Sequence, residues 1–380
     1  MPPKESTKAK NKKSPTKKEL KAQARRGENW YFEDGSTVIQ VEEKLFNIHR
    51  TLFERESTFF QTLFSLPQGE SLEGSSDDNP IVCQDMIADF RALCWAIYCN
   101  PREILAQQNW KTIDFPRMVR LVAISHKYDC ITLRDWALDV LDAYSVDNPG
   151  KLVYPCKEWG SCGRILDLAY QCARKDLAER IEKDWLGRIE DRSHNESLIA
   201  FDQALTAAER SNYLRQFHGR AYYSYLKSTG IFNTRAQDSF GTTSVPGVTS
   251  CMDESLAAFN DQRKLRIYQG FWSLSQLRLT LTQAPKLDDN ASCSQHSRDC
   301  AEGWKNWWKA AFDDNMQAGM SWNDPGDLIK MINDKAQSRE RLYYSGCYTF
   351  PCDRFLKKQV VSMKANFDNT IPDRFGIPKE

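Results

Sequence analysis

The sequence predicts an α+β fold over its N-terminal part, followed by a mainly α-helical C-terminal region. The first observation behind this prediction is the stretch "STVIQVEEKLFNIH", where apolar and polar residues alternate over short runs typical of half-buried strands. The second is the three- and four-residue apolar spacing that begins directly after it and recurs along the chain, which indicates helices. Strands followed by helices is the order of an α+β unit.

The composition is that of a globular chain with ample core material. Of its 380 residues, 41% are hydrophobic and 12% are aromatic, which is enough for at least two compact domains. No stretch approaches the roughly 18 uninterrupted apolar residues of a membrane helix, and the first residues lack the apolar segment of a secretory signal. We therefore expect no membrane association and an intracellular location, in the nucleus, the cytoplasm or both, with the 12 cysteines mostly reduced.

A basic tail precedes an acidic body. Residues 1–26 hold ten Lys or Arg and two Glu, so in a chain of net charge +1 the remaining residues carry about −7. The tail has almost no large apolar residue to offset the entropy of ordering, which predicts disorder over residues 1–27. Its clusters suit a nuclear import signal, weak nonspecific contact with nucleic acid, or mere solubilisation of the chain.

The first structured element is predicted to be a β-hairpin. Asp34-Gly35 bends the chain before it, and the acidic pair Glu42-Glu43 marks the turn between its two strands. A helix is expected from about Arg50 to Leu66, closed by Pro67. It carries more large apolar side chains than one helical stripe hides in a small domain, which predicts a dimer interface. The predicted interface residues are Leu52, Phe53, Phe59, Phe60, Leu63 and Phe64.

A third strand and further helices complete the predicted unit. "PIVCQD" reads as a short buried strand, and Asp85 is a candidate cap of the helix that contains Phe90 and Tyr98. "NP" breaks this helix. A helix pair follows in "PRMVRLVAISHKYDC", opened by Pro116, and "ITLRDWALDVLDAYS".

These residues carry a resemblance to a known family. Phe46, Ile48, His49, Arg50, Phe53, Ser57, Phe60 and Phe64 are spaced as in the core motif of the BTB/POZ domain. Downstream, "AIYCN" resembles the end of a helix in that family, and "ISHKYDCITLRDWA" is similar to its next motif. The resemblance covers residues 30–145 and implies a structural role for Phe46, His49, Ser57, Tyr98, Tyr128 and Leu133.

The resemblance implies an interaction module and not a catalyst. BTB domains form homodimers and recruit other proteins, either to a cullin scaffold of a ubiquitin ligase or to transcriptional regulators. The loop "SLPQGESLEGSSDDNP" lacks the apolar-x-Glu element by which cullin binding is judged. In the family His49 would be architectural, and its own segment holds no nucleophile or acid to suggest catalysis.

The second half is predicted to be helical, with one break rich in Ser, Thr and Gly. Spaced tryptophans follow a Cys/His segment there, an order similar to C-terminal regions of fungal BTB proteins. Trp304, Trp307, Trp308, Ala311 and Phe312 share one helical face. Either this face packs against Tyr268, Phe271 and Trp272 in a core, the favoured interpretation, or it binds a partner.

Chemical motifs are sparse. The chain contains no Gly-rich phosphate loop and none of the common hydrolase, metalloprotease or kinase signatures, so we expect no enzyme, no catalytic residue and no cofactor. Cys293, His296 and Cys300, with Cys347 and Cys352 downstream, are the residue types that bind zinc. Their spacing matches no common zinc finger, and the prediction is that no metal binds.

The predicted organisation has five parts. They are a disordered basic tail (1–27), a BTB/POZ domain (28–147), a helical extension (148–229), a flexible linker (230–258) and an aromatic-rich helical region (259–380). The predicted function is that of a homodimerising adaptor. The alternative is a nuclear regulator that contacts nucleic acid through its tail.

Overall fold

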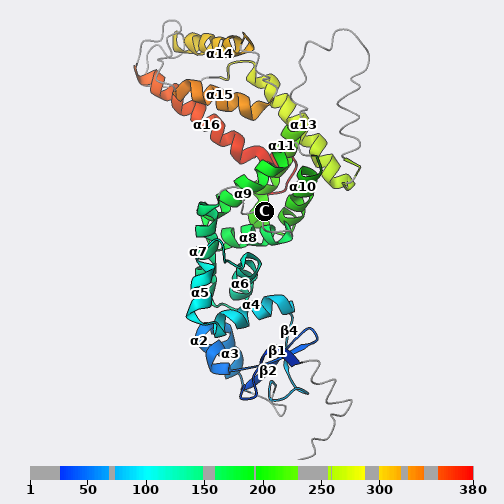
Figure 1. The fold of residues 1–380 in the computed structure, drawn as a ribbon. Helices are drawn as coiled ribbons and strands as arrows, with labels where there is room; N and C mark the ends of the chain where they lie inside the picture. Colours follow the sequence, from blue (N-terminus) through cyan, green and yellow to red (C-terminus); the bar gives the residue numbers. More distant parts are fainter. Residues whose placement is uncertain are drawn as a thin grey trace, which may run out of the picture. The chain divides into compact units, whose positions relative to one another are not determined.

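The computed structural model describes residues 26–67, 73–148, 159–191, 194–229, 256–257, 259–286, 299–317, 324–337 and 350–379. These residues form a mixed α+β structure that is mostly helical, with one four-stranded sheet (Figure 1). The coarse fold class predicted from the sequence is therefore confirmed. The chain divides into two compact units, Met1–Pro149 and Gly150–Glu380, and each is described by itself.

The sheet of the first unit contains the predicted hairpin and the predicted third strand. Its strands are β1 (Arg26–Tyr31), β2 (Thr37–Val41), β3 (Lys44–Ile48) and β4 (Ile81–Cys83), in the order β1-β3-β2-β4. β2 and β3 are antiparallel, whereas β1 runs parallel to β3 and β4 parallel to β2. The hairpin turns at the predicted acidic pair, where Glu42 has a positive φ of 50°.

Strand β1 corrects the predicted end of the basic tail. Arg26 and Gly27 were expected to be disordered, but both belong to β1. Arg26 is held there by an ion pair with Asp77 (2.9 Å), and its guanidinium lies over the ring of Tyr31. Tyr31 also donates a 2.5 Å hydrogen bond to Asp77. The rest of the predicted tail, residues 1–25, lies outside the described residues.

The helix expected from Arg50 to Leu66 is two helices. α2 (Arg50–Glu56) ends at Ser57, and α3 (Thr58–Ser65) begins directly after it. Ser57 is extended and caps α3, because its Oγ accepts a hydrogen bond from the amide of Phe60 (3.0 Å). Because the helix is interrupted at Ser57, α2 and α3 have different orientations. α2 buries Phe53, and α3 buries Phe60 and Phe64.

The remaining helices of this unit are α4 (Ile87–Tyr98), α5 (Pro101–Gln107), α6 (Phe115–Lys127) and α7 (Ile131–Asp147). α4 begins after Met86, so the predicted cap by Asp85 is wrong. The Asp85 carboxylate instead accepts a hydrogen bond from Tyr128 and pairs with Lys127 (2.6 Å). α5, which the sequence analysis did not predict, starts with Pro101 behind an Asn100 capping box.

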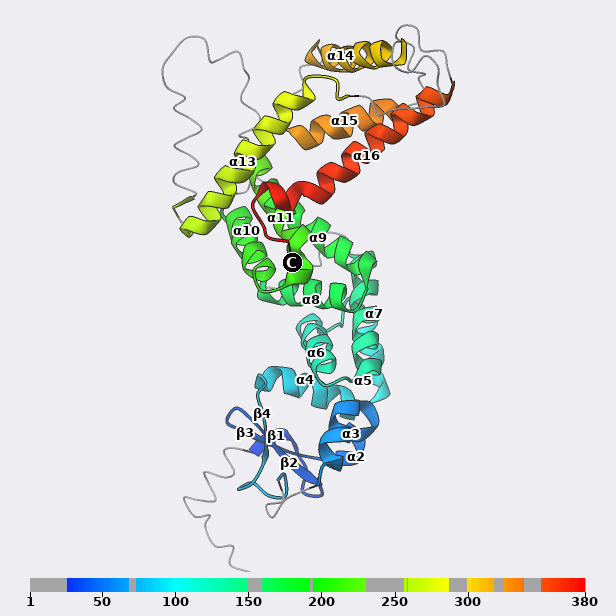
Figure 2. The same cartoon turned by 180° about the vertical axis from the view of Figure 1, so that it is seen from behind.

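The core of the first unit lies between the sheet and the helices. Both views show α4 between the sheet and the α6–α7 pair (Figure 2). Phe46 of β3 meets Phe90 of α4 edge to face, with ring centroids 4.9 Å apart. Phe53 and Phe60 meet in the same way at 5.2 Å, so the two short helices join one aromatic core.

The second unit is helical throughout the part that the structure describes. Its helices are α8 (Trp159–Gln171), α9 (Lys175–Glu190), α10 (His194–Ala208), α11 (Arg215–Ser228), α13 (Asp261–Leu281), α14 (Ala301–Gln317), α15 (Pro325–Gln337) and α16 (Phe350–Arg374), with a 3₁₀ turn at Asn212–Leu214. α11 packs against α9, α10, α13 and α16. None of the described helices is long and apolar enough to cross a membrane.

Most of the predicted linker lies outside the described residues. This applies to 230–255 and to 258. Leu256 is buried in the unit, so the predicted linker ends before residue 258. The finer division of the second unit stays a prediction.

Trp304 and Trp308 of α14 are buried, but not against the predicted face, and Trp307 is half-buried. Trp304 and Trp308 donate hydrogen bonds from their indole nitrogens to the carbonyl oxygens of Pro285 (2.8 Å) and Leu281 (2.9 Å). They therefore pack at the C-terminal end of α13. Tyr268 and Trp272, expected to cover them, remain 48% and 66% exposed. Indole N–H groups seek a carbonyl partner when buried, and the free carbonyls of a helix end supply one.

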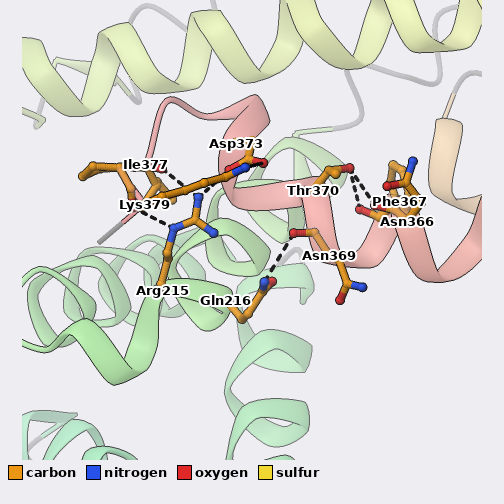
Figure 3. A network of polar contacts seen from close by, with 10 residues as sticks. Arg215, Gln216, Asn366, Phe367, Asn369, Thr370, Asp373, Ile377 and Lys379 are labelled. Carbon is orange, nitrogen blue, oxygen red and sulfur yellow. Dashed lines mark hydrogen bonds and ion pairs between the residues drawn. The ribbon is translucent and has the colours of Figure 1, made fainter.

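The C-terminal segment after α16 folds back onto α11. Phe375 is fully buried and stacks on Tyr222, with ring centroids 5.3 Å apart. Arg215, at the start of α11, pairs with Asp373 and donates hydrogen bonds to the carbonyl oxygens of Ile377 (3.0 Å) and Pro378 (2.7 Å) (Figure 3). This segment is therefore an integral part of the core of the second unit.

Arg263 is a buried arginine of this unit that forms an ion-pair cluster. It is 9% exposed and pairs with Asp202 of α10 (2.6 Å) and with Glu209 (2.7 Å). Burial alone would raise the pKa of Glu209, but the hydrogen bonds and charge of Arg263 outweigh it and lower that pKa below its usual value. α13 is thereby tied electrostatically to the end of α10.

This cluster predicts a specific acid sensitivity. A carboxyl whose pKa is lowered by folding contributes stability that is present above its unfolded pKa of about 4.3 and is lost as pH falls through the folded value. The wild type should therefore lose its advantage in unfolding free energy over Arg263→Met between about pH 5 and pH 3. Urea unfolding at a series of pH values measures this. Lys264→Met, which removes a neighbouring cation paired with the exposed Asp261, is the control. If its effect varies with pH as much as that of Arg263→Met, the assignment is refuted.

Candidate interaction surface

His49 lies at the strand-to-helix corner and contacts Tyr98. Its amide donates a hydrogen bond to the Tyr98 hydroxyl oxygen (2.9 Å), and its Nδ1 lies 3.0 Å from the same atom. Its ring packs against Phe32 at 5.0 Å, and its Nε2 lies 3.4 Å from Asp34. These contacts join the sheet to the end of α4, and the architectural role of His49 stays a prediction.

The contacts of His49 predict the effect of replacing it. His49→Gln keeps a polar side chain but loses the ring packing and must order a flexible amide beside Tyr98, so it should destabilise the protein by about 0.5–1.5 kcal/mol. Denaturant unfolding of the full chain measures this. Asp34→Ala, at a position whose side chain is 86% exposed, should have almost no effect. A neutral His49→Gln would show that the corner does not depend on the imidazole.

Ser57 and Tyr128 connect the first helices to the loop between α6 and α7. The Ser57 hydroxyl donates to the carbonyl oxygen of Tyr128 (2.5 Å), and the Thr58 hydroxyl donates to Asp129. The Tyr128 ring lies 4.8 Å from that of Phe60. Burial, followed by the nearby Cys83 and Asp85, raises the pKa of the Tyr128 hydroxyl, so it remains a neutral hydrogen-bond donor.

The remaining predicted motif residues are Phe46 and Leu133, and they are described by their burial. Phe46 is fully buried, and Leu133 is half-buried in the first turns of α7.

Among the cysteines nearby, burial raises the pKa of Cys130 to about 12. Its thiol is therefore protonated at neutral pH and is a poor nucleophile.

The six predicted interface residues fall into two groups. Phe53, Phe60 and Phe64 are buried in the core of the unit, so they cannot also form a free surface, and the prediction is wrong for them. The break at Ser57 explains the error, because two short helices hide more apolar area than one straight stripe. Leu52 and Leu63 are half-buried, and Phe59 is 44% exposed.

An outward-facing apolar row therefore remains on α3. It consists of Phe59, Leu63 and, at the end of the helix, Leu66, which is 55% exposed. We call these three residues the α3 stripe. Phe59 and Leu63, four residues apart, lie on one face of α3, turned by about 100° from the face of Phe60 and Phe64. Leu66 follows the last helical residue with an extended backbone, so helical spacing alone does not place it.

The predicted zinc residues are mostly beyond what the structure describes. Cys293, His296 and Cys347 lie outside the described residues, as does the side chain of Cys352. Cys300 is buried before α14. Within the described ranges, no group of His, Cys, Asp or Glu side chains is arranged to hold a metal ion.

Comparison with known proteins adds no relative. No protein-family model matches the chain, and no curated protein matches it.

Proposed function

We propose that this chain is a protein–protein interaction module of the BTB/POZ type, which forms a homodimer and recruits other proteins. The observation that carries the proposal is the α3 stripe. Phe59, whose ring also contacts Tyr128, is 44% exposed, Leu63 beside it is half-buried, and Leu66 directly after α3 is 55% exposed, while Phe60 and Phe64 hold the helix in the core. A rigid helix with apolar side chains facing solvent is a surface suited to a partner.

The three sequence motifs that resemble the BTB/POZ family also support this proposal. Their residues contact one another across long sequence separations, through the His49–Tyr98 and Ser57–Tyr128 hydrogen bonds. Each motif thus stabilises the next, as expected if they belong to one inherited architecture. The described order is β1, the β2–β3 hairpin, α2, α3, β4 and then α4 to α7. It keeps the predicted hairpin, third strand and following helices, and it adds β1, α5 and the break between α2 and α3.

A second copy of the chain is the proposed occupant of the stripe. A single helical row is self-complementary about a two-fold axis, because each apolar side chain can meet its counterpart on an antiparallel helix. Arg50 and Glu54, which form an ion pair on the neighbouring helix α2, would lie at the polar rim. The dimer then presents two recruiting units together.

The proposed recruited partner is either a cullin scaffold or a transcriptional regulator. The loop before β4 is the segment by which cullin binding was judged from the sequence. Its described part, from Glu73 onward, folds back on the sheet through Val38, whose amide donates to the Gly74 carbonyl (2.7 Å), while residues 68–72 lie outside the described ranges. The basic tail, on which nuclear import and weak nucleic-acid binding depend, lies outside them as well. We propose an intracellular adaptor, in the nucleus, the cytoplasm or both.

Light scattering on the full chain at micromolar concentration tests the proposal. The wild type should have the mass of two chains of 43.9 kDa. The double variant Phe59→Ser, Leu66→Ser should have the mass of one, with an unchanged circular dichroism spectrum. The control is Leu105→Ser on α5, where the side chain is 61% exposed; it should stay dimeric. A monomeric wild type, or a double variant that remains dimeric, would refute the proposed interface.

A further inference from the structure

The second unit contains a cavity that the adaptor function does not use. Its volume is about 430 Å³, and its walls come from the end of α10, the start of α11, the first turns of α13 and the C-terminal segment 377–379. The chemically informative residues in its lining are Glu209, Arg215, His218, Arg266 and Lys379. The volume falls in the range of small-molecule sites, about 300–1,000 Å³.

Most of the charges around this cavity are already paired. Arg215 binds Asp373 and the last carbonyl oxygens, and Lys379 pairs with the other oxygen of Asp373 (3.0 Å). Glu209 is paired with Arg263, whose guanidinium donates two hydrogen bonds to its carboxylate (2.7 and 3.0 Å). Three of the four ionic groups in the lining are therefore satisfied by protein partners.

Arg266 is the exception. It projects from α13 one turn after Arg263, it lines the cavity, and it forms no ion pair with a carboxylate in the described part of the chain. A guanidinium presents a planar fork of donors that matches a carboxylate or a phosphate in a two-point hydrogen bond. Arg266 does act on its neighbours, because burial raises the pKa of Tyr222 and the hydrogen bonding and charge of Arg266 oppose that larger effect. The cavity thus has one guanidinium without an ion pair in the described residues, of the kind that recognises oxyanions.

His218 provides a second, independent observation. It is 4% exposed, it forms part of the cavity wall, and its Nε2 has no hydrogen-bond partner among the described residues. Its ring stacks on Tyr222 at 5.3 Å. Burial, followed by the charge of Arg266, lowers its pKa to about 4, so the ring is neutral at physiological pH. Buried polar atoms without a partner are uncommon. This one has almost no solvent-accessible surface, so it lies behind the cavity surface and does not by itself contact a ligand.

We propose that this cavity binds a small molecule bearing a carboxylate or phosphate group, with the oxyanion paired to Arg266. The neutral His218 ring forms the wall beside it. Arg215 and Lys379, both paired with Asp373, also line the cavity. Because residues 377–379 line the cavity, its shape depends on the docked C-terminal segment, and ligand binding should stabilise that docking.

Thermal unfolding of the full chain in millimolar inorganic phosphate or acetate tests this site, with sodium chloride holding the ionic strength constant. At least one anion should raise the melting temperature saturably, and which of them does so distinguishes phosphate from carboxylate recognition. Arg266→Gln should weaken the apparent affinity about tenfold or more, because it removes a charged hydrogen-bond donor. Arg266→Lys, which keeps the charge but not the fork, should be intermediate.

The matched control is Arg278→Gln on the same helix, a residue that does not line the cavity. It should bind like the wild type. The proposal is overturned if neither anion stabilises saturably, if Arg278→Gln loses as much affinity as Arg266→Gln, or if Arg266→Gln binds like the wild type. Should Arg266→Gln fail to fold, Arg266→Lys decides, and undiminished binding by that variant overturns the two-point contact.

Discussion

Phe60→Ala is expected to destabilise the first unit by about 3–5 kcal/mol, whereas Phe59→Ala, one residue earlier, should cost at most about 1 kcal/mol. Phe60 is fully buried among Phe53, Phe64 and Tyr128, and truncating it removes its transfer free energy and leaves a cavity. Phe59 is 44% exposed. The two substitutions delete the same atoms, so the difference between them reports the orientation of α3.

Urea unfolding followed by circular dichroism measures the first effect, and amide hydrogen exchange of α3 localises it, since two units need not unfold in one step. Phe59→Ala should weaken dimerisation while leaving the unfolding of α3 nearly unchanged. Equal losses of stability would mean that α3 is rotated from the orientation described, and the α3 stripe would then lose its basis.

Gly270→Ala should destabilise the second unit by about 1–3 kcal/mol, against the direction expected from helix propensity. In mid-helix, alanine is favoured over glycine by about 0.8–1 kcal/mol. However, a Cβ on Gly270 would lie 1.9 Å from Cε1 of Phe375, which is fully buried. The ring has to move away from its contact with Tyr222, and the resulting strain exceeds the gain in propensity.

Gly187→Ala is the matched control for this prediction. Gly187 is exposed in the last turn of α9, and a Cβ there would meet no atom within 4 Å. It should therefore stabilise the protein by about 0.5–1 kcal/mol. Thermal or urea unfolding of both variants gives the comparison. If Gly270→Ala is as stabilising as Gly187→Ala, Phe375 does not pack on α13.

Local sequence patterns predicted the elements that are determined by nearby residues, such as hairpin turns and breaks at proline. The hairpin follows from alternation and an acidic turn, and the breaks at Asn100-Pro101 and Pro67 follow from the geometry of proline. The break at Ser57 was missed because the spacing of apolar residues continues through it. The interaction that favours it, the hydrogen bond to Tyr128, joins residues 71 positions apart.

The site residues show the same limit. Spacing alone could place Phe59 and Phe60 on a helix but not say which of them faces the core. That depends on contacts from elsewhere in the chain, such as those of Phe60 with Phe53 of α2 and with Tyr128. β1 was missed because "RGENWY" has no alternating apolar pattern. The cavity around Arg266 was unpredictable in principle from local pattern, since its walls come from segments more than 150 residues apart, as the 163 positions between Arg215 and Pro378 show.

The docking of the C-terminal segment on α11 has a consequence for biosynthesis. Arg215 and Asp373 are 158 positions apart, and at about 5–20 residues per second a ribosome needs roughly 8–30 s to make the chain between them. During that interval Phe217 and Tyr222 of α11 are already synthesised, but Phe375, which stacks on Tyr222, is not. Nascent chains of the second unit should therefore occupy chaperones for longer than those of the first, whose core is complete once α7 has left the exit tunnel.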